Sequence, residues 1–167
     1  MPKLKMKPDK IISDAIAFLS KARTLFAKAQ EEGLILGNDN HIGDIGEYWV
    51  MKYYLSLGQF KEYAPKKNSK YDIKLTNNSK VSVKTISGWA KHSYGSQIKM
   101  GPECEWTILA GVALDDRLYP CKIAIVNINE VKNKEPFLSN AVRIGNGNVT
   151  YPRFKWWKWL DEYLIDF

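Results

Sequence analysis

The chain has 167 residues, of which 45% are hydrophobic and 13% aromatic, and this composition excludes a disordered protein and favours one globular domain spanning residues 1–167. No apolar run approaches the roughly 20 residues that span a membrane, and no apolar signal core follows the basic start, so we expect a cytoplasmic protein without a membrane partner. The net charge is +7, and residues 61–100 alone hold nine basic and two acidic residues. Such a local basic field favours a polyanionic partner such as nucleic acid, but charge alone does not distinguish this from a plain solvated lysine surface.

The first third of the chain predicts two helices. Apolar residues recur at steps of three and four over 10–32, and Gly33 follows as a stop signal. A second apolar stripe runs over 42–57 and ends at Gly58, with a turn at 37–40 between the two helices.

The rest of the chain predicts mainly strands. The strand candidates are 71–76, 80–86, 106–114 and 122–128, with a polar loop or short edge strand at 61–69 and a strand or ribbon at 141–151. Residues 87–103 are rich in glycine, serine and basic residues and predict a long functional loop. A short helix is expected at 154–165. This order predicts an α/β or α+β fold in which a β-meander of four or five strands packs against helices.

Three charged residues lie beside or within apolar segments, where charged side chains are unusual. Glu47 lies at the margin of the second helix's apolar stripe, with Gly43 leaving room one turn earlier. Asp72 lies inside a strand, where aspartate is disfavoured, and Lys84 lies between Val83 and Thr85 in the next strand. Each of these residues taken alone could be an ordinary exposed position.

Together, the segments 43–47, 71–73 and 81–85 resemble the PD-(D/E)XK nuclease superfamily, whose signature is an acid on a helix, an aspartate on one strand and X-x-Lys on the next. The resemblance implies a restriction-endonuclease-like fold with a central mixed sheet of about five strands flanked by helices. It also implies a Mg²⁺- or Mn²⁺-dependent endonuclease of the restriction or DNA-defence type, with double-stranded DNA as substrate and a homodimer as the assembly. Asp72, Lys84, Glu47 and Ser82 would then form the catalytic set.

The chain departs from this family pattern at Ser82, where the family usually has Glu, Asp or Gln. Serine supplies no anionic ligand, so the metal would be held by Asp72, Glu47 and the carbonyl of Val83. The alternative is a nuclease-fold protein that binds nucleic acid or another partner after losing its chemistry, and Ser82 is the feature that favours it. A third possibility is a structural or inhibitory protein that only shares the fold.

Two further segments mix basic and aromatic residues. The loop after Lys84 is expected to contact nucleic acid through backbone contacts and base stacking, although a plain surface loop is an equal alternative. The residues expected to make these contacts are Lys91, His92, Ser93, Tyr94, Gln97 and Lys99. The tryptophan-rich run that begins at 153 predicts core packing by Phe154, Trp157, Leu160 and Leu164, or else a dimer interface.

A geometric condition follows from the hairpin between the two site-bearing strands. A two-residue loop at Asn77-Asn78 would place Asp72 and Lys84 on opposite faces of the sheet. A three-residue loop at 77–79 would pair Asp72 with Lys84 and point Ser82 into the same cleft. We therefore expect an odd loop or a β-bulge. The two cysteines, Cys104 and Cys121, predict reduced, mostly buried thiols and no zinc site.

Overall fold

The computed structural model describes residues 9–31, 40–65, 69–88, 95–100, 104–138, 143–145 and 148–167. Helices α1 (Lys10–Glu31) and α2 (Asn40–Ser56) come first and agree with the two predicted helices. The long strands follow, and a short helix, α3 (Ile128–Lys132), comes directly after the last strand of the sheet. The Asn127 side chain accepts a hydrogen bond from the backbone of Asn129 and so caps α3, which the sequence patterns did not reveal.

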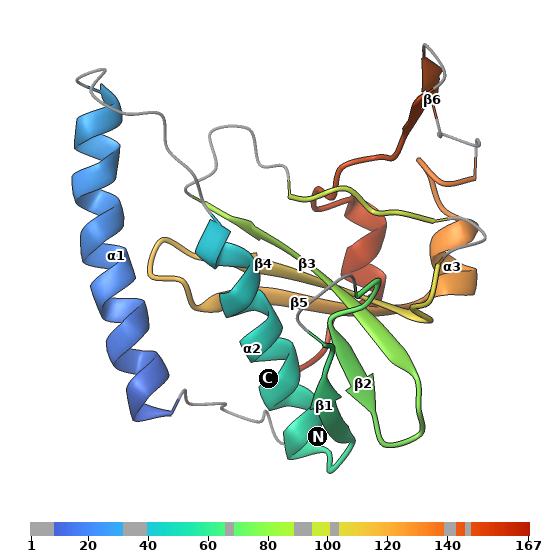
Figure 1. Cartoon of the computed structure of the whole chain (residues 1–167), viewed down its shortest axis with the longest axis horizontal. Coiled ribbons are helices and arrows are strands. Elements are labelled where there is room, and N and C mark those ends of the chain that lie inside the picture. The colour runs from blue at the N-terminus through green and yellow to red at the C-terminus, as the bar shows by residue number, and fades with distance from the viewer. Residues whose placement is uncertain are drawn as a thin grey trace.

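A five-stranded mixed sheet forms the centre of the molecule, in the order β1 (Phe60–Tyr63), β2 (Ile73–Leu75), β3 (Lys80–Ser87), β4 (Ile108–Leu114) and β5 (Pro120–Asn127). Figure 1 shows α2 lying across one face of this sheet, with α1 at the edge of the molecule. The mixed α+β class and the number of strands agree with expectation. The predicted meander is wrong at one place, because β3 and β4 pair in parallel.

Parallel pairing of consecutive strands requires a connection that returns along the sheet, and the described residues 95–100 of this connection lie on one face. On that face, two fully buried side chains, Ile98 and Phe154, pack with Leu109 of β4. Residues 152–154 hydrogen-bond with 95–98, including an isolated bridge between Gln97 and Arg153. Helices α1 and α2 therefore pack on one side of the sheet, and these irregular segments pack on the other together with Val131 and Leu160 from the short helices near the C-terminus.

The C-terminal part of the chain differs in detail from expectation. The ribbon predicted at 141–151 is a pair of short strands, β6 (Arg143–Gly145) and β7 (Asn148–Thr150). The terminal helix is a 3₁₀ helix, η1 (Lys158–Tyr163), and is shorter than predicted. Phe154, Trp157 and Leu160 are buried, as the core-packing interpretation predicted, but the same expectation is wrong for Leu164, which is 44% exposed because the helix ends at Tyr163.

Two remaining expectations concern cysteines and membranes. Both cysteines are free thiols, as expected, and Cys104 is partly buried, but the expectation of a mostly buried thiol is wrong for Cys121, which is exposed because it lies near the start of the edge strand β5. Among the residues that the structure describes, no helix is long and apolar enough to cross a membrane.

Candidate functional site

The hairpin between β2 and β3 determines which side chains share a face. Leu75 and Ser79 close a three-residue loop, in which Asn78 takes a left-handed conformation with φ of 64°. Asparagine tolerates this conformation better than most residues, and loops of this length commonly require it. The expectation of an odd loop is confirmed.

The register of this hairpin differs by two residues from the one expected. Ile73 pairs with Val81 and Lys74 with Lys80, because the loop consists of 76–78 and not of 77–79. Asp72 therefore lies beside Ser82, and the predicted direct pairing of Asp72 with Lys84 is wrong. A shift of two residues preserves the alternation of faces, so Lys84 still projects into the same cavity as Asp72 and Ser82.

Asp72 lies at the point where the regular β2–β3 pairing ends. Its backbone N–H donates to the carbonyl of Val81 at 2.9 Å, and its carbonyl accepts from Ala64 at 2.9 Å. Its carboxylate accepts the Val83 N–H at 2.6 Å and the Ser82 hydroxyl at 3.4 Å. Strand β2 does not extend far enough to take the Val83 N–H, so the carboxylate accepts it and is held against β3.

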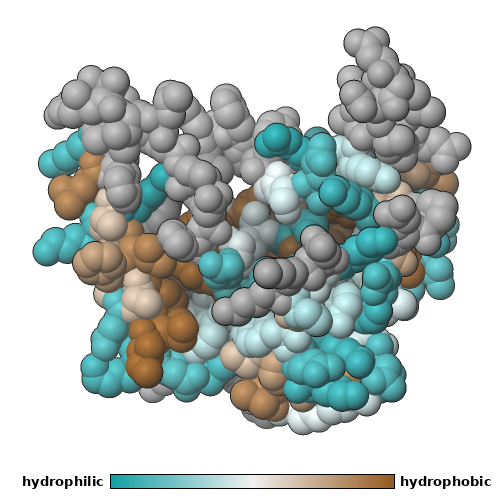
Figure 2. Space-filling view, viewed as in Figure 1, coloured by the Kyte–Doolittle hydropathy of each residue, from teal (hydrophilic) through white to brown (hydrophobic). Residues whose placement is uncertain are grey.

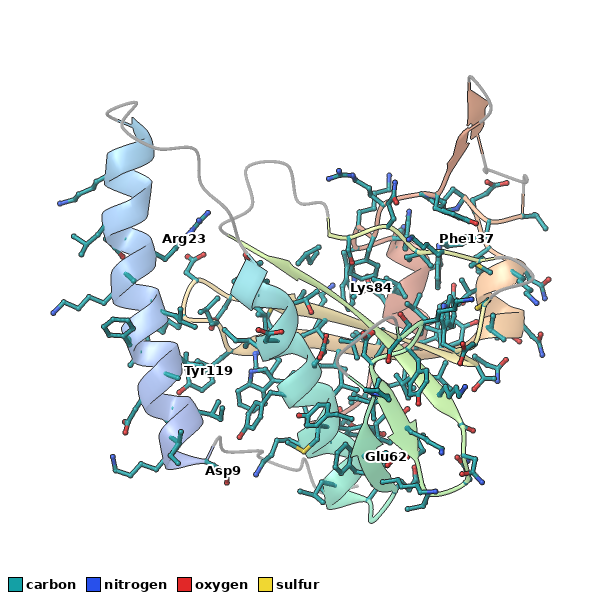
Figure 3. All side chains as sticks on the ribbon, viewed as in Figure 1. Asp9, Arg23, Glu62, Lys84, Tyr119 and Phe137 are labelled. Atoms are coloured by element: carbon teal, nitrogen blue, oxygen red, sulfur yellow. The ribbon has the colours of Figure 1, made fainter. Side chains whose placement is uncertain are left out.

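Lys84 extends from β3 into the middle of the molecule (Figure 3). It pairs across the parallel ladder with Gly111 of β4, whose missing side chain leaves room for the buried ring of Phe154. Burial lowers the pKa of the Lys84 ammonium, and the nearby positive charge of Lys99 lowers it further, whereas Asp72 and Glu47 act in the opposite direction. Lys84 is thus a cation held in a poorly solvated place between carboxylates and a second lysine.

Glu47 approaches the same residues from α2. Gly46 makes this possible, because a Cβ at that position would lie only 1.8 Å from the Thr85 Oγ1 atom of β3. The helix therefore packs closely against the strand next to Lys84. Desolvation raises the pKa of the Glu47 carboxyl to about 7, and the negative charges of Asp72 and Asp44 contribute to this rise. Such a shift is typical of functional carboxylates that share a site.

A cavity of about 470 Å³ lies on the face of the sheet that carries Asp72 and Lys84. Its floor comes from β3, and its other walls come from the crossing segment 95–100 and from the stretch before Phe154. Three lysines and one aspartate make its charged lining positive. The lining residues are Ser69, Lys70, Asp72, Ser82, Lys84, Ser96, Gln97, Lys99, Met100, Cys104, Trp106 and Tyr151.

The structure brings together part of the expected nucleic-acid-binding set. Gln97 and Lys99 line the cavity, whereas Lys91, His92, Ser93 and Tyr94 lie outside the described residues. Lys70 and Tyr151 also line the cavity but were not anticipated. Lys70 comes two residues before Asp72, which could have indicated its role, whereas no local pattern marks Tyr151.

The expected metal ligands can be tested against this geometry. Within the part of the chain that the structure describes, no cluster of three His, Cys, Asp or Glu side chains is arranged to hold a metal ion. Asp72 and Glu47 nevertheless lie close enough for the charge of one to raise the pKa of the other. Mg²⁺ is commonly held by one or two carboxylates and several waters, so this pair fits a hydrated hard cation. The expected third ligand, the Val83 carbonyl, belongs to β3 between Ser82 and Lys84. The neutral Ser82 adds no charge to the donor set.

The chain was also compared with known proteins. No protein-family model matches it, and no curated protein is significantly similar in sequence.

Proposed function

We propose that this protein is a metal-dependent nuclease of the PD-(D/E)XK type, which hydrolyses phosphodiester bonds in DNA with Mg²⁺ or Mn²⁺ as cofactor. The observation that carries the proposal is one cavity in which Asp72, Lys84 and Lys99 meet and to which Glu47 is electrostatically coupled. The order of acid on a helix, aspartate on one strand and lysine on the next is that of the superfamily signature, and the five-stranded mixed sheet is compatible with its fold.

The chemistry assigns a role to each side chain. Asp72, Glu47 and the carbonyl of Val83 would hold the cation, which when bound lowers the pKa of a coordinated water and neutralises charge on the phosphate. Lys84 donates hydrogen bonds to the phosphate oxygens as negative charge builds there, and its poorly solvated position strengthens this interaction. Lys70 and Lys99 bind the flanking phosphates and orient the strand.

The decisive experiment is cleavage of supercoiled plasmid and of single-stranded circular DNA with Mg²⁺, Mn²⁺ or EDTA. Wild type is expected to nick or linearise DNA only with the metal. Asp72→Asn is the matched variant, since it keeps the shape of the side chain but removes its charge, and it is expected to be inactive. Equal cleavage by Asp72→Asn and wild type, or full cleavage in EDTA, would contradict the proposal.

A second candidate function is nucleic-acid binding without hydrolysis, and a specific contact favours it. Ser82 supplies a neutral hydroxyl that donates to Asp72 at the position where the superfamily usually has an acidic or amide side chain. If the chemistry has been lost here, the protein should bind DNA but not cleave it with either metal. Ser82→Asp then tests whether the missing charge is the cause, because it should increase the melting-temperature shift caused by Mg²⁺, whereas the neutral Ser82→Asn should not.

A further inference from the structure

Helix α1 carries a row of large hydrophobic side chains in contact with solvent. Ile11, Phe18 and Leu25 are 82%, 72% and 62% exposed, and they recur every seven residues. Figure 2 shows brown, hydrophobic residues along this flank of the molecule, where α1 lies in Figure 1. Exposed apolar residues are ordinary when scattered, but a row of three on one helix needs an explanation.

The row is distinct from the side of α1 that packs on the protein's own core. That side carries Ile16, which is buried, together with the partly buried Ile12 and Leu19. At about 100° per residue, Ile11 and Phe18 lie roughly 140–160° around the helix from Ile16. The helix therefore has two apolar faces, and its own domain buries only one of them.

The spacing of the exposed face is that of a helix-pairing seam. Ala15 and Ala22 lie between the large residues, so the positions 11, 15, 18, 22 and 25 are separated by alternating steps of four and three. In an antiparallel pair of α1 helices, Phe18 would lie against Ala22 of the second copy, and Leu25 against its Ala15. Each large side chain then meets a small one, so the pattern is complementary to itself.

The charges beside the seam agree with the same antiparallel register. Asp14, which forms an ion pair with Lys10 of its own helix at 2.7 Å, borders the seam on the same side as Lys28, and the two would meet across the pair, twice by symmetry. Within one helix they are 14 residues apart, about 21 Å, so they cannot pair with each other in a single chain. Lys21 would meet its own copy near the axis, which opposes pairing at low salt.

The contact area of such a pair is modest but sufficient for association. The exposed parts of Ile11, Phe18 and Leu25 amount to roughly 400 Å² of apolar surface, which is in the range of the largest patch on a typical monomer. Pairing would bury about twice this area plus the flanking residues, which corresponds to the smaller end of specific interfaces. We propose that this α1 face, and not the site of the proposed nuclease, makes the protein a homodimer through antiparallel pairing of α1 with a second copy.

The test is the mass of the full chain by light scattering and sedimentation, from roughly 10 to 200 μM, a range chosen because dimerisation depends on concentration. Wild type is expected to approach twice 19.2 kDa. Phe18→Glu should weaken the dimer by at least about 30-fold, since a central apolar anchor is lost, and leave the circular dichroism spectrum unchanged. Leu138→Glu, at another exposed hydrophobic position, is the matched control and should leave the mass unchanged.

A charge exchange distinguishes this pairing from any other association. Asp14→Lys and Lys28→Asp should each weaken the dimer, and the double variant should restore it. A monomeric wild type over the whole range would overturn the proposal and assign the face to a different partner. A dimer that survives Phe18→Glu, or a double variant that remains weak, would overturn it equally.

Discussion

The two faces of the β2–β3 hairpin differ in almost every property although their residues alternate along the same strands. One face presents Ile73, Val81 and Val83 to helix α2, and all three are buried in an apolar cluster. The other presents Asp72 and Lys84 to the cavity, where they are joined by lysines from elsewhere in the chain. Stability and proposed chemistry thus depend on opposite faces of the sheet. A substitution should affect one or the other according to the face on which its side chain lies.

The largest effect expected concerns Lys84. Lys84→Ala should lower the rate of metal-dependent DNA cleavage by roughly 10²–10³-fold, because it removes a hydrogen-bond donor aimed at developing charge. Val81→Ala, on the opposite face, should instead cost about 2 kcal/mol of unfolding free energy and leave the cleavage rate per folded molecule unchanged. Cleavage assays and urea denaturation measure the two effects. A Lys84→Ala variant that cleaves DNA at the wild-type rate would contradict the assignment of the proposed chemistry to the cavity face.

The close contact between α2 and β3 can be disturbed by a single methyl group. Gly46→Ala places a Cβ against Thr85, so the helix must move, and we expect a loss of about 3 kcal/mol in stability. Gly43→Ala is the control on the same helix, because a Cβ there meets nothing within 4 Å, and it should stabilise the protein by about 0.5–1 kcal/mol. Thermal denaturation of both variants checks this pair. Equal effects of the two substitutions would show that the helix does not pack as described.

The raised pKa of Glu47 predicts a pH dependence of stability. With a pKa of about 7 in the folded protein and 4.5 ordinarily, the native state binds the proton more tightly. The contribution of this group is therefore fully present below pH 4.5 and is lost as the pH rises through 7. The shift corresponds to at most about 3 kcal/mol, and solvent screening of this partly exposed group reduces our expectation to about 1–2 kcal/mol.

Glu47→Gln removes this loss, so the variant should gain about 1–2 kcal/mol over wild type at pH 8 compared with pH 5. Melting temperatures from pH 5 to pH 8, in EDTA so that no cation contributes, measure the difference. The same gain at both pH values would mean that the Glu47 carboxyl does not titrate in this window.

The smallest effect expected concerns the basic lining of the cavity. Lys99→Gln should weaken DNA binding and reduce the slope of log affinity against log salt by about 1, because one phosphate contact is lost. Lys132→Gln, in α3, is the control and should leave the slope unchanged. Fluorescence anisotropy between roughly 50 and 200 mM salt provides the measurement. Equal slopes for Lys99→Gln and wild type would place the DNA elsewhere.

Local sequence patterns predicted most of the helices and strands but not the parallel connection between β3 and β4. Helices α1 and α2 and the long strands followed from apolar periodicity, and the odd loop at Asn78 followed from the requirement that Asp72 and Lys84 share a face. The parallel pairing of β3 with β4 could not be read from the sequence, because strand direction depends on a connection whose composition indicates only a loop. The two-residue error in register arose because the expected loop 77–79 and the observed loop 76–78 both contain Asn77 and Asn78, so the sequence did not distinguish them.

The residues of the candidate site could be predicted from the sequence where a charged side chain lies inside an apolar strand. Asp72 and Lys84 stood out because charge is disfavoured inside apolar strands, and both line the cavity. Lys70, Met100 and Tyr151 lie in irregular segments, where such residues are ordinary and carry no local signal. Only the folded chain brings them together with the strands.

The pairing of residues 95–98 with 152–154 has a consequence for how such a protein could change over evolutionary time. The floor of the cavity belongs to a strand whose register is fixed on both sides, so its length cannot vary without moving the proposed catalytic groups. Its roof is built from two connections joined by a few backbone hydrogen bonds. Under the proposed function, substitutions at Gln97 or Lys99 would therefore alter which nucleic acid is accepted, while the catalytic groups on β3 would be inherited unchanged.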